Sequence, residues 1–573
     1  MCRPVSKRAE TDIGEVWELC DQYVSDMGAR LGMPEVSPAT AENPRPAVPP
    51  QLRVLEAFAP DSYPAYMLIE YNYFDIDYRS EFAIMFNASF NPPYDDVWRV
   101  HFFGKVDRLP SDTTLRTFVE RAKSSYRGYF ILRPDEDSTV GRALIRPTRQ
   151  LSWLRARDET PRHVRTAVSE SIDIFGVPVD AVGLPFMQQD GRVLRCAHVN
   201  AWMCHYTAVL RGVVPRRYAA MFHASDDPSV SLGRSYPSQG LSLVSLSRIL
   251  GANDLGPDII TNIGLLTTRK LRWFDRKRLW DKVEEATRTP AVAEPPSTPT
   301  LQTDGDRDER VAKIWSHENV VTVVARYLNS GFPVIAVRAG HSHMQTITGY
   351  VRRSDLGREA RKIADAENEV DDIVCFVAQD DTWGPFRRVW VHDLVRQLDP
   401  SQSSLSLVVP LPAGLWLSGG AAETNAAEIL ATSVARRLEA VGRDGRADDT
   451  YRGLRDLDKA MKRNGPGNYG LRTYAAFGRD FKEGFTRNLR AGAAASRVIG
   501  YSSLPRFVWV VEVVDRRLRR KTRDHVVATV VLDGSAVDTL RPTQARRQMI
   551  PLLVHIPGQI SSPPRDDTYS DAV

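Results

Sequence analysis

Short runs of aromatic and β-branched residues recur along this chain, and they constrain its fold more than any other feature. Residues 66–71 and 98–103 are two such runs, and residues 128–133 form a third that Pro134 follows directly. Aromatic and β-branched side chains suit the half-buried surface of a sheet, and proline ends a strand because it has no N–H to donate. We therefore expect residues 52–150 to form an α+β region with a substantial sheet.

The rest of the chain alternates helical and strand patterns. Apolar residues recur three and four positions apart in residues 12–33 and 316–330, and residues 420–446 are rich in alanine, so each segment is predicted to be helical. Further apolar runs typical of strands are 331–339, 506–514 and 524–533. The mixture predicts the α+β fold class for the whole chain.

Two stretches without apolar periodicity divide the sequence. Residues 34–51 are rich in proline and indicate a linker, and residues 286–309 are either a second linker or an exposed insertion inside one domain. These breaks predict four regions along the chain. They are an N-terminal helix with the Pro-rich linker (1–51), an N-terminal α+β domain (52–165), a central core containing the low-complexity insertion (166–400), and a C-terminal α+β region (401–573).

Composition excludes several classes of protein. The net charge is +5, from 76 basic and 71 acidic residues, which is too balanced for a dedicated nucleic-acid binder. The basic residues 516–523 are interpreted as a solvated turn between two strands. No window reaches the ~18–20 apolar residues of a membrane-spanning helix, and no apolar signal segment follows the N-terminus. We expect a cytoplasmic protein with neither nucleic acid nor membrane as a partner.

The cysteines point to a reducing compartment. The chain has five of them, and an odd, sparse set in a chain of this length is unlike a disulfide framework. They are Cys2, Cys20, Cys196, Cys204 and Cys375. Each thiol is therefore either a packing residue or part of a reactive site. Cys204 and Cys375 fall inside a helical pattern and a strand pattern, and we expect both to be buried thiols.

Cys196 stands at the start of a predicted helix that runs to about residue 210. A thiol in the first turn of a helix lies near the positive end of the helix dipole. This favours the thiolate, which is the nucleophilic form. Gln188 and Gln189 lie shortly upstream, where a side-chain amide can donate to an oxyanion.

A histidine and a carboxylate follow on two predicted strands. His343 lies between the apolar run at 331–339 and a second run that ends at Tyr350, and Asp380 ends the apolar run that begins at Val374. Thiol on a helix, histidine on a strand and carboxylate on the next strand is the order found in papain-like cysteine hydrolases. In such sites the imidazole takes the thiol proton, the carboxylate fixes its tautomer, and the sulfur attacks a carbonyl.

The chain resembles the compact papain-like peptidases of the C39-like kind over about residues 120–390. Within them it is most similar to a family of large bacterial proteins with a series of short motifs in a fixed order. Here these are Gly141-Arg142 after the strand at 128–134, the pattern QQD…CA ending at Ala197, PSQGL at 237–241, HMQTITGY from His343, and DDTWGPF from Asp380. The resemblance implies a papain-like catalytic core over 166–400 and a protein or peptide substrate, with no cofactor.

The same resemblance implies a role for each site residue. Cys196 would be the nucleophile, His343 the general base and acid, and Asp380 the residue that orients the histidine. Gln188 or Gln189 would donate to the oxyanion, although Asp190 occupies the position six residues before the cysteine where the family has glutamine. The His-x-x-Thr pattern favours His343 over His341. Asp380 is preferred to Asp381 because it directly ends the apolar run.

Other interpretations of these residues stay open. Cysteines and histidines are concentrated here, but structural zinc sites usually need a C-x₂₋₄-C pair, which the sequence lacks, so zinc is less favoured. We expect His198 and His205 to pack or cap on the surface of the helix. The same triad also serves transglutaminase-like and deamidating enzymes. A catalytically inactive papain-like scaffold that binds another protein is the alternative from a different class.

Overall fold

The structure is a computed structural model in which two compact units are separable. One comprises Met1–Ile260 with Gly331–Pro412, and the other comprises Thr261–Ser330 with Ala413–Val573. The structure describes residues 14–18, 65–87, 92–106, 113–134, 139–147, 163–190, 194–219, 242–260, 317–338, 343–352, 373–391, 405–443, 469–487, 493–515, 526–536, 551–556 and 559–561, with a few single positions between them. Mixed helices and strands confirm the α+β class.

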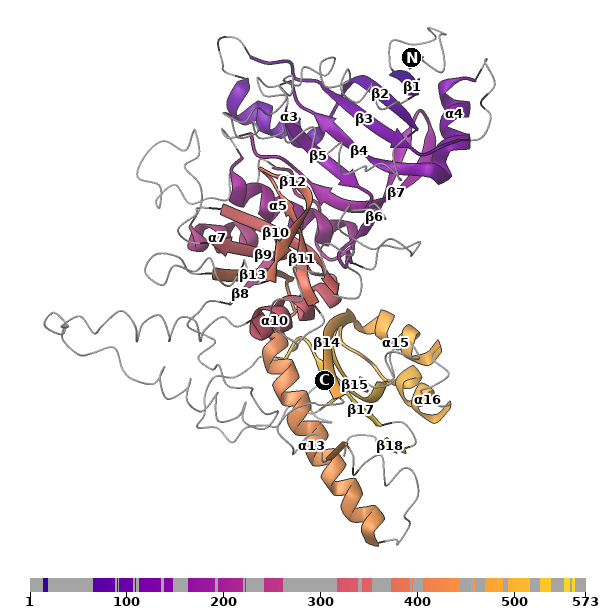
Figure 1. Ribbon diagram of the computed structural model, residues 1–573, viewed down its shortest axis with the longest axis vertical. Helices are drawn as coiled ribbons and strands as arrows, with labels where there is room; N and C mark the ends of the chain where they lie inside the picture. The colour runs from indigo at the N-terminus through magenta and orange to yellow at the C-terminus, as the bar shows by residue number, and fades with distance from the viewer. Residues whose placement is uncertain are drawn as a thin grey trace, which may run out of the picture. The chain divides into compact units, whose positions relative to one another are not determined.

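A seven-stranded antiparallel sheet forms the N-terminal part of the first unit (Figure 1). Its spatial order is β1-β2-β3-β4-β5-β7-β6. The strands are β1 (Gly14–Glu18), β2 (Tyr66–Tyr73), β3 (Val97–Phe103), β4 (Tyr126–Leu132), β5 (Val140–Ile145), β6 (Val168–Ile174) and β7 (Val177–Phe186). The strands expected at 66–71, 98–103 and 128–133 are confirmed. β6 and β7 follow the domain boundary expected at residue 165, and they pair within this sheet.

The helix expected over residues 12–33 is wrong at residues 14–18, which form β1. Val16 is buried opposite Leu68 of β2, while Glu15 and Glu18 are exposed. Pairing with the edge of β2 satisfies the backbone of this short segment and overrides its helical apolar spacing. The remainder of 12–33 and the linker expected at 34–51 lie outside the described residues.

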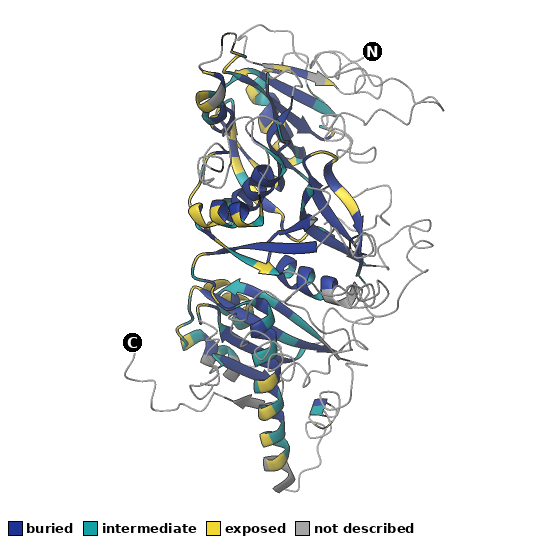
Figure 2. Cartoon of the chain, turned by 90° about the vertical axis from the view of Figure 1, so that its left-hand side faces the viewer, coloured by how far each residue is buried: buried dark blue, intermediate teal, exposed yellow. Residues whose placement is uncertain are grey.

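Burial follows position in this sheet. β5 is buried along its whole length and β4 at all but one position, as expected for central strands. Figure 2, coloured by burial, shows much of this sheet in the dark blue of buried residues. β7 alternates buried and exposed residues until Gly183 and is buried from there to Phe186, where it pairs with β5.

The helical segments are α3 (Ile76–Glu81), the π-helix η2 (Phe82–Phe86), α4 (Leu115–Ala122) and the 3₁₀ turn η3 (Lys123–Ser125). α4 places Phe118, Val119 and Ala122 in the core.

A six-stranded antiparallel sheet completes the first unit. Its order is β12-β11-β10-β9-β13-β8. The strands are β8 (Leu255–Ile260), β9 (Val334–Arg338), β10 (His343–Arg352), β11 (Ile373–Asp380), β12 (Gly384–Trp390) and β13 (Leu405–Pro412), and the helices are α5 (Cys196–Leu210) and α7 (Leu243–Ala252). α5 packs against β10 and β7, so it contacts strands of both sheets. Residues 197–208 of this helix are all buried, so the helix is enclosed by its neighbours and its polar side chains have to find partners inside the protein.

The second unit is built on a meander of β14 to β18. Its strands are β14 (Tyr469–Phe477), β15 (Phe507–Asp515), β16 (Val526–Asp533), β17 (Leu553–Ile556) and β18 (Gln559–Ser561), and its helices are α10 (His317–Asn329), α13 (Gly419–Arg443), α15 (Gly478–Arg487) and α16 (Ala493–Tyr501). The helices expected at 316–330 and 420–446 are confirmed. They are joined by a buried ion pair of 2.7 Å between Arg326 Nη2 and Glu423 Oε2. Residues 286–309 and 516–523 lie outside the described part of the chain.

The strands expected at 331–339, 506–514 and 524–533 are also confirmed, as β9, β15 and β16. β15 and β16 are antiparallel neighbours with Val510 opposite Val531 in the core. Among the helices that the structure describes, none combines the length and apolarity needed to cross a membrane.

Candidate active site

Cys196 is the first residue of α5, and its thiol faces β10. Its Sγ accepts a hydrogen bond of 3.2 Å from the backbone N–H of Met344 and lies 3.2 Å from the carbonyl oxygen of the same residue. Arg195 precedes the helix in an extended conformation, and its N–H donates to His198 Nδ1 at 3.2 Å. The nucleophile predicted from the sequence therefore lies at the junction between a helix start and the first residues of a strand.

His343 begins β10 and lies between the thiol and a carboxylate. Its Nδ1 is 3.8 Å from Cys196 Sγ, and its Nε2 is 2.9 Å from Asp380 Oδ2. β10 and β11 are antiparallel and pair Thr346 with Gln379, so the start of β10 lies beside the end of β11. This register brings together the histidine and carboxylate that the sequence placed 37 residues apart.

Asp380 is fixed by hydrogen bonds on both carboxylate oxygens. Oδ1 accepts from the N–H groups of Thr382 (3.0 Å) and Trp383 (2.8 Å), and Oδ2 accepts from Gln345 Nε2 (2.6 Å) as well as from His343. Burial alone would raise the pKa of Asp380. The hydrogen bond and charge of His343, with the Trp383 and Gln345 donors, outweigh it and lower that pKa.

The turn after Asp380 explains the glycine in its motif. Gly384 has φ +97° and pairs back with Asp380 as β12 begins. Such a positive φ strains any residue with a Cβ. The DDTWGPF pattern therefore describes a tight connection that returns the chain while leaving the N–H groups of residues 382 and 383 directed at the Asp380 carboxylate.

Asn200 contacts the residues around the thiol and was not among the residues predicted from the sequence. Its Nδ2 donates to Cys196 O (2.7 Å) and Met344 O (3.3 Å) and lies 3.5 Å from Cys196 Sγ. Its Oδ1 accepts a hydrogen bond of 2.5 Å from Thr346 Oγ1. A polar residue four positions after the cysteine on the same helix face was the available signal. The threonine of the His-x-x-Thr pattern therefore ties the strand of the histidine to the helix of the cysteine.

Gly349 explains the next part of the same motif. The segment at residues 163–165 crosses β10 here, with Tyr350 N–H donating to His163 O at 2.9 Å and Arg165 N–H donating to Thr348 O at 3.0 Å. A Cβ on Gly349 would lie 1.9 Å from His163 O. Only glycine permits this close approach, which links the site strand to the segment leading into β6.

Asp381 forms a second carboxylate beside the thiol. An oxygen of Asp381, the Sγ of Cys196 and a ring nitrogen of His343 all lie within 4.8 Å of one another. The Asp381 side chain is fully buried, and the Cys196 thiol is its one hydrogen-bonding neighbour among the described residues. Burial is the largest cause that raises the pKa of Asp381 to about 6, and the charge of the neighbouring Asp380 is the next. From the sequence, Asp381 was expected only as the less favoured alternative to Asp380.

The protonation state expected for Cys196 needs correction. The helix start was expected to favour the thiolate. Instead the pKa of the Cys196 thiol is raised, mainly by burial and secondly by the negative charge of Asp381. The Met344 N–H lowers it by a smaller amount. Desolvation and a nearby carboxylate therefore outweigh the helix dipole, and the resting group is the neutral thiol.

The two glutamines are held in different places. Gln188 is buried, and its Oε1 accepts a hydrogen bond of 3.1 Å from Val140 N–H at the start of β5. Gln189 directs its Nε2 towards Thr382 Oγ1 at 3.4 Å, within the turn that holds Asp380. Asp190 accepts from Leu194 N–H at 2.9 Å just before α5. The structure thus brings Gln189, rather than Gln188, to the turn of the candidate triad.

The other sulfur and imidazole groups occupy packed positions. Cys204 and Cys375 are buried, as expected, and burial raises the pKa of each thiol to about 12. His198 caps the start of α5 by accepting from Arg195 N–H and His205 packs, as expected, but both are buried and not on an exposed helix surface, because α5 is enclosed by its neighbours. Burial lowers the pKa of His205 to about 4. His341 and the element at 237–241 lie outside the described residues.

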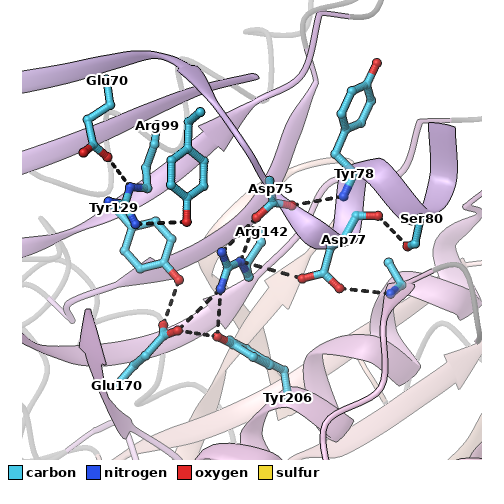
Figure 3. A network of polar contacts seen from close by, with 12 residues as sticks. Glu70, Asp75, Asp77, Tyr78, Ser80, Arg99, Tyr129, Arg142, Glu170 and Tyr206 are labelled. Atoms are coloured by element: carbon cyan, nitrogen blue, oxygen red, sulfur yellow. Dashed lines mark hydrogen bonds and ion pairs between the residues drawn. The ribbon is translucent and has the colours of Figure 1, made fainter. Parts of the chain in front are cut away.

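A buried polar network anchors α5 to the seven-stranded sheet (Figure 3). Arg142 of β5 donates to Asp75 Oδ2 at 2.8 Å and to the hydroxyl of Tyr206, on α5, at 3.3 Å. Tyr206 donates in turn to Glu170 Oε1 at 2.6 Å. Arg142, from the Gly-Arg pair of the sequence pattern, therefore contacts α5 towards its C-terminal end, away from Cys196.

Comparisons with known proteins leave the site to be judged from its own geometry. No family model, curated protein or solved structure matches the chain. What carries chemistry here is one thiol, one imidazole and two carboxylates, contributed by α5, β10 and the end of β11.

Proposed function

We propose that this chain is a papain-like thiol hydrolase, a cysteine peptidase that cleaves peptide or isopeptide bonds. One observation supports it above the others: a continuous path of contacts runs from Cys196 Sγ through both ring nitrogens of His343 to Asp380 Oδ2. The three residues come from separate elements and follow the order of the papain-like triad. An α-helix carrying the thiol and packed on an antiparallel sheet that carries the other two residues is the core that the sequence resemblance implies.

In this mechanism His343 acts first as a base and then as an acid. Nε2–H donates to Asp380, which leaves the Nδ1 lone pair directed at the thiol. Nδ1 takes the Sγ proton as sulfur bonds to the substrate carbonyl carbon, and then gives it to the leaving amine as the C–N bond breaks. Water then attacks the thioester with the same base. The acid product leaves and the thiol is restored.

The raised pKa of Cys196 makes this base essential. A site with a preformed thiolate reacts with electrophiles even when its histidine is removed, whereas a neutral buried thiol needs a proton acceptor at the moment of attack. Met344 N–H, 3.2 Å from Sγ, stabilises the developing negative charge on sulfur. Reactivity of Cys196 should therefore depend strongly on His343.

Gln189 is the better candidate for the oxyanion donor. Its amide N–H group is directed at the turn beside Asp380, while the amide oxygen of Gln188 is engaged by the backbone of β5. A side-chain amide aimed at the tetrahedral oxygen typically contributes on the order of 10²–10³ in kcat. α5 begins at Cys196, and the backbone N–H groups of a helix's first turn have no intrahelical partner, so they provide a second source of donors.

An activity-based probe tests the proposal directly. The full chain, kept reduced and treated with a chelator, is exposed to an electrophilic peptide ketone, and covalent labelling is measured by intact mass. We expect one label per chain in the wild type and in Cys375→Ala, which removes a buried thiol outside the site. Cys196→Ala and His343→Ala should each abolish labelling. Labelling that persists in Cys196→Ala, or that is as strong in His343→Ala as in the wild type, contradicts the proposal and favours an inactive scaffold.

A further inference from the structure

The proposed triad leaves the Asp381 carboxylate unused. This side chain is fully buried, and among the described residues its one hydrogen-bonding neighbour is the Cys196 thiol. A buried ionised carboxylate without a donor is costly, and such groups are normally paired or coordinate a metal. Among the described residues, this carboxylate lies beside the Cys196 thiol and the His343 imidazole, so an ion shared by these three groups could neutralise it.

The three side chains offer the donor atoms of a catalytic-type zinc site. One sulfur, one imidazole nitrogen and one carboxylate oxygen lie within 4.8 Å of one another, and Sγ and Nδ1 are 3.8 Å apart. Ligands about 2.0–2.3 Å from a common ion are separated by roughly 3.3–3.8 Å in tetrahedral geometry. Sites with three protein ligands and one open position do not use the C-x₂₋₄-C spacing of structural zinc sites. Its absence from the sequence therefore does not argue against this arrangement.

The surroundings of the three groups are those of metal ligands. A metal-bound histidine usually donates its other ring N–H to a carboxylate, and His343 Nε2 is 2.9 Å from Asp380 Oδ2. The thiol sulfur accepts from Met344 N–H at 3.2 Å, which supports a thiolate. Thiolate and carboxylate together carry two negative charges, which a divalent cation neutralises.

We propose that Cys196 Sγ, His343 Nδ1 and one Asp381 oxygen bind a divalent cation of the zinc class, and that this ion blocks the nucleophile. Binding exchanges the thiol proton for the metal and involves no electron transfer. The Nδ1 lone pair that serves as the base in the apo protein is then occupied as well. The blocking role rests on the proposed hydrolase function, whereas the binding site does not.

Cobalt substitution tests the site without measuring activity. The full chain is stripped with a chelator, kept reduced with a phosphine, and titrated with Co²⁺ while the absorption of the thiolate–cobalt charge-transfer band is recorded. We expect one Co²⁺ per chain, displaced by Zn²⁺. Cys196→Ser should remove the band, and Asp381→Asn should weaken binding by more than about 100-fold because it removes a ligand. Asp380→Asn should weaken it about 10–100-fold.

Asp480→Asn is the matched control, since this exposed carboxylate on α15 pairs with Arg479 far along the chain from the cluster. Its Co²⁺ affinity should equal that of the wild type. No charge-transfer band at saturating Co²⁺, or affinity unchanged by Asp381→Asn, overturns the site. The probe labelling of the chelated protein separates the two proposals. Labelling without metal binding refutes only the site, and metal binding without His343-dependent labelling refutes the hydrolase and the blocking role.

Discussion

Asp380 and Asp381 are adjacent in sequence, yet only Asp380 contacts the ring nitrogen of His343 that faces away from the thiol, at 2.9 Å from Nε2. Asp381 lies on the other side, with Cys196 Sγ and His343 within 4.8 Å. Successive residues at a strand end point to opposite faces, which separates two identical carboxylates into two environments. Asp380 is fixed by four donors, whereas the only hydrogen-bonding neighbour of Asp381 among the described residues is the Cys196 thiol.

We predict that Asp380→Asn and Asp381→Asn have unlike effects on turnover of a peptide substrate by the chelated protein. Asp380→Asn should lower kcat by roughly 10²–10⁴-fold, because the amide that replaces the carboxylate does not fix the imidazole tautomer. Asp381→Asn should retain or increase kcat, because it removes a negative charge that disfavours the developing thiolate. Steady-state kinetics on both variants measures the contrast, and equal losses would argue against the assigned division of roles.

The hydrogen bond between Thr346 and Asn200 gives a second prediction. Thr346→Val leaves the buried Asn200 Oδ1 without its donor, at a cost of about 1–3 kcal/mol in the free energy of unfolding. Because Asn200 also contacts Met344 O and Cys196 O, kcat should fall as well. Thr346→Ser keeps the hydroxyl and should recover most of both. Denaturant unfolding and kinetics of the two variants provide the measurement; a serine variant as impaired as valine would mean that the methyl group matters more than the bond.

Sequence alone could predict the strands and the three triad candidates because each depends on local information. Apolar runs predict strands such as β4 and β15, and Cys196, His343 and Asp380 each lie at the end of a predicted element. Element ends are where side chains can meet across a fold. Asp380 was preferred to Asp381 because it ends the apolar run, and His343 to His341 because of the His-x-x-Thr pattern of the resemblance; both lie in the contact path.

What the sequence could not supply depends on tertiary contact. The pattern at residues 14–18 suits a helix, and only the open edge of β2 makes it a strand. The pKa of Cys196 was expected to follow the helix dipole, but burial and Asp381 decide its direction. Asn200 and the Arg142 network connect residues 64 to 146 positions apart, and no local periodicity encodes such pairs.

Gly349→Ala should be strongly destabilising. The added methyl group would lie 1.9 Å from His163 O, so the crossing segment at 163–165 has to move away from β10. Overpacking of this kind typically lowers the free energy of unfolding by about 1–3 kcal/mol, and occasionally by more. Gly251→Ala, on α7 with no atom within 4 Å of the new Cβ, is the matched control and should be neutral or slightly stabilising. Thermal unfolding of the two variants measures the difference, and equal midpoints would show that the segment does not cross β10 this closely.

Acid should destabilise the seven-stranded sheet through His101 and Glu70. His101 is fully buried, with Nδ1 2.8 Å from Tyr126 Oη and Nε2 3.0 Å from Glu70 Oε2. Burial lowers the pKa of His101 to about 4, below its value of about 6.5 in the unfolded chain. The unfolded state therefore binds the proton first, and stability present above pH ~6.5 is lost as the pH falls towards 4.

Glu70 acts in the same direction. Burial would raise the pKa of its carboxyl, but the hydrogen bonds and charges of His101 and Arg99 lower it, so its contribution is also lost as the pH falls through the folded value. We expect the free energy of unfolding of the wild type to decrease between pH 6.5 and 4, and the slope to be smaller in His101→Gln, which keeps hydrogen-bonding capacity but does not titrate. Urea unfolding at several pH values measures both slopes. A His101→Gln variant with the wild-type slope would place the acid sensitivity in other groups.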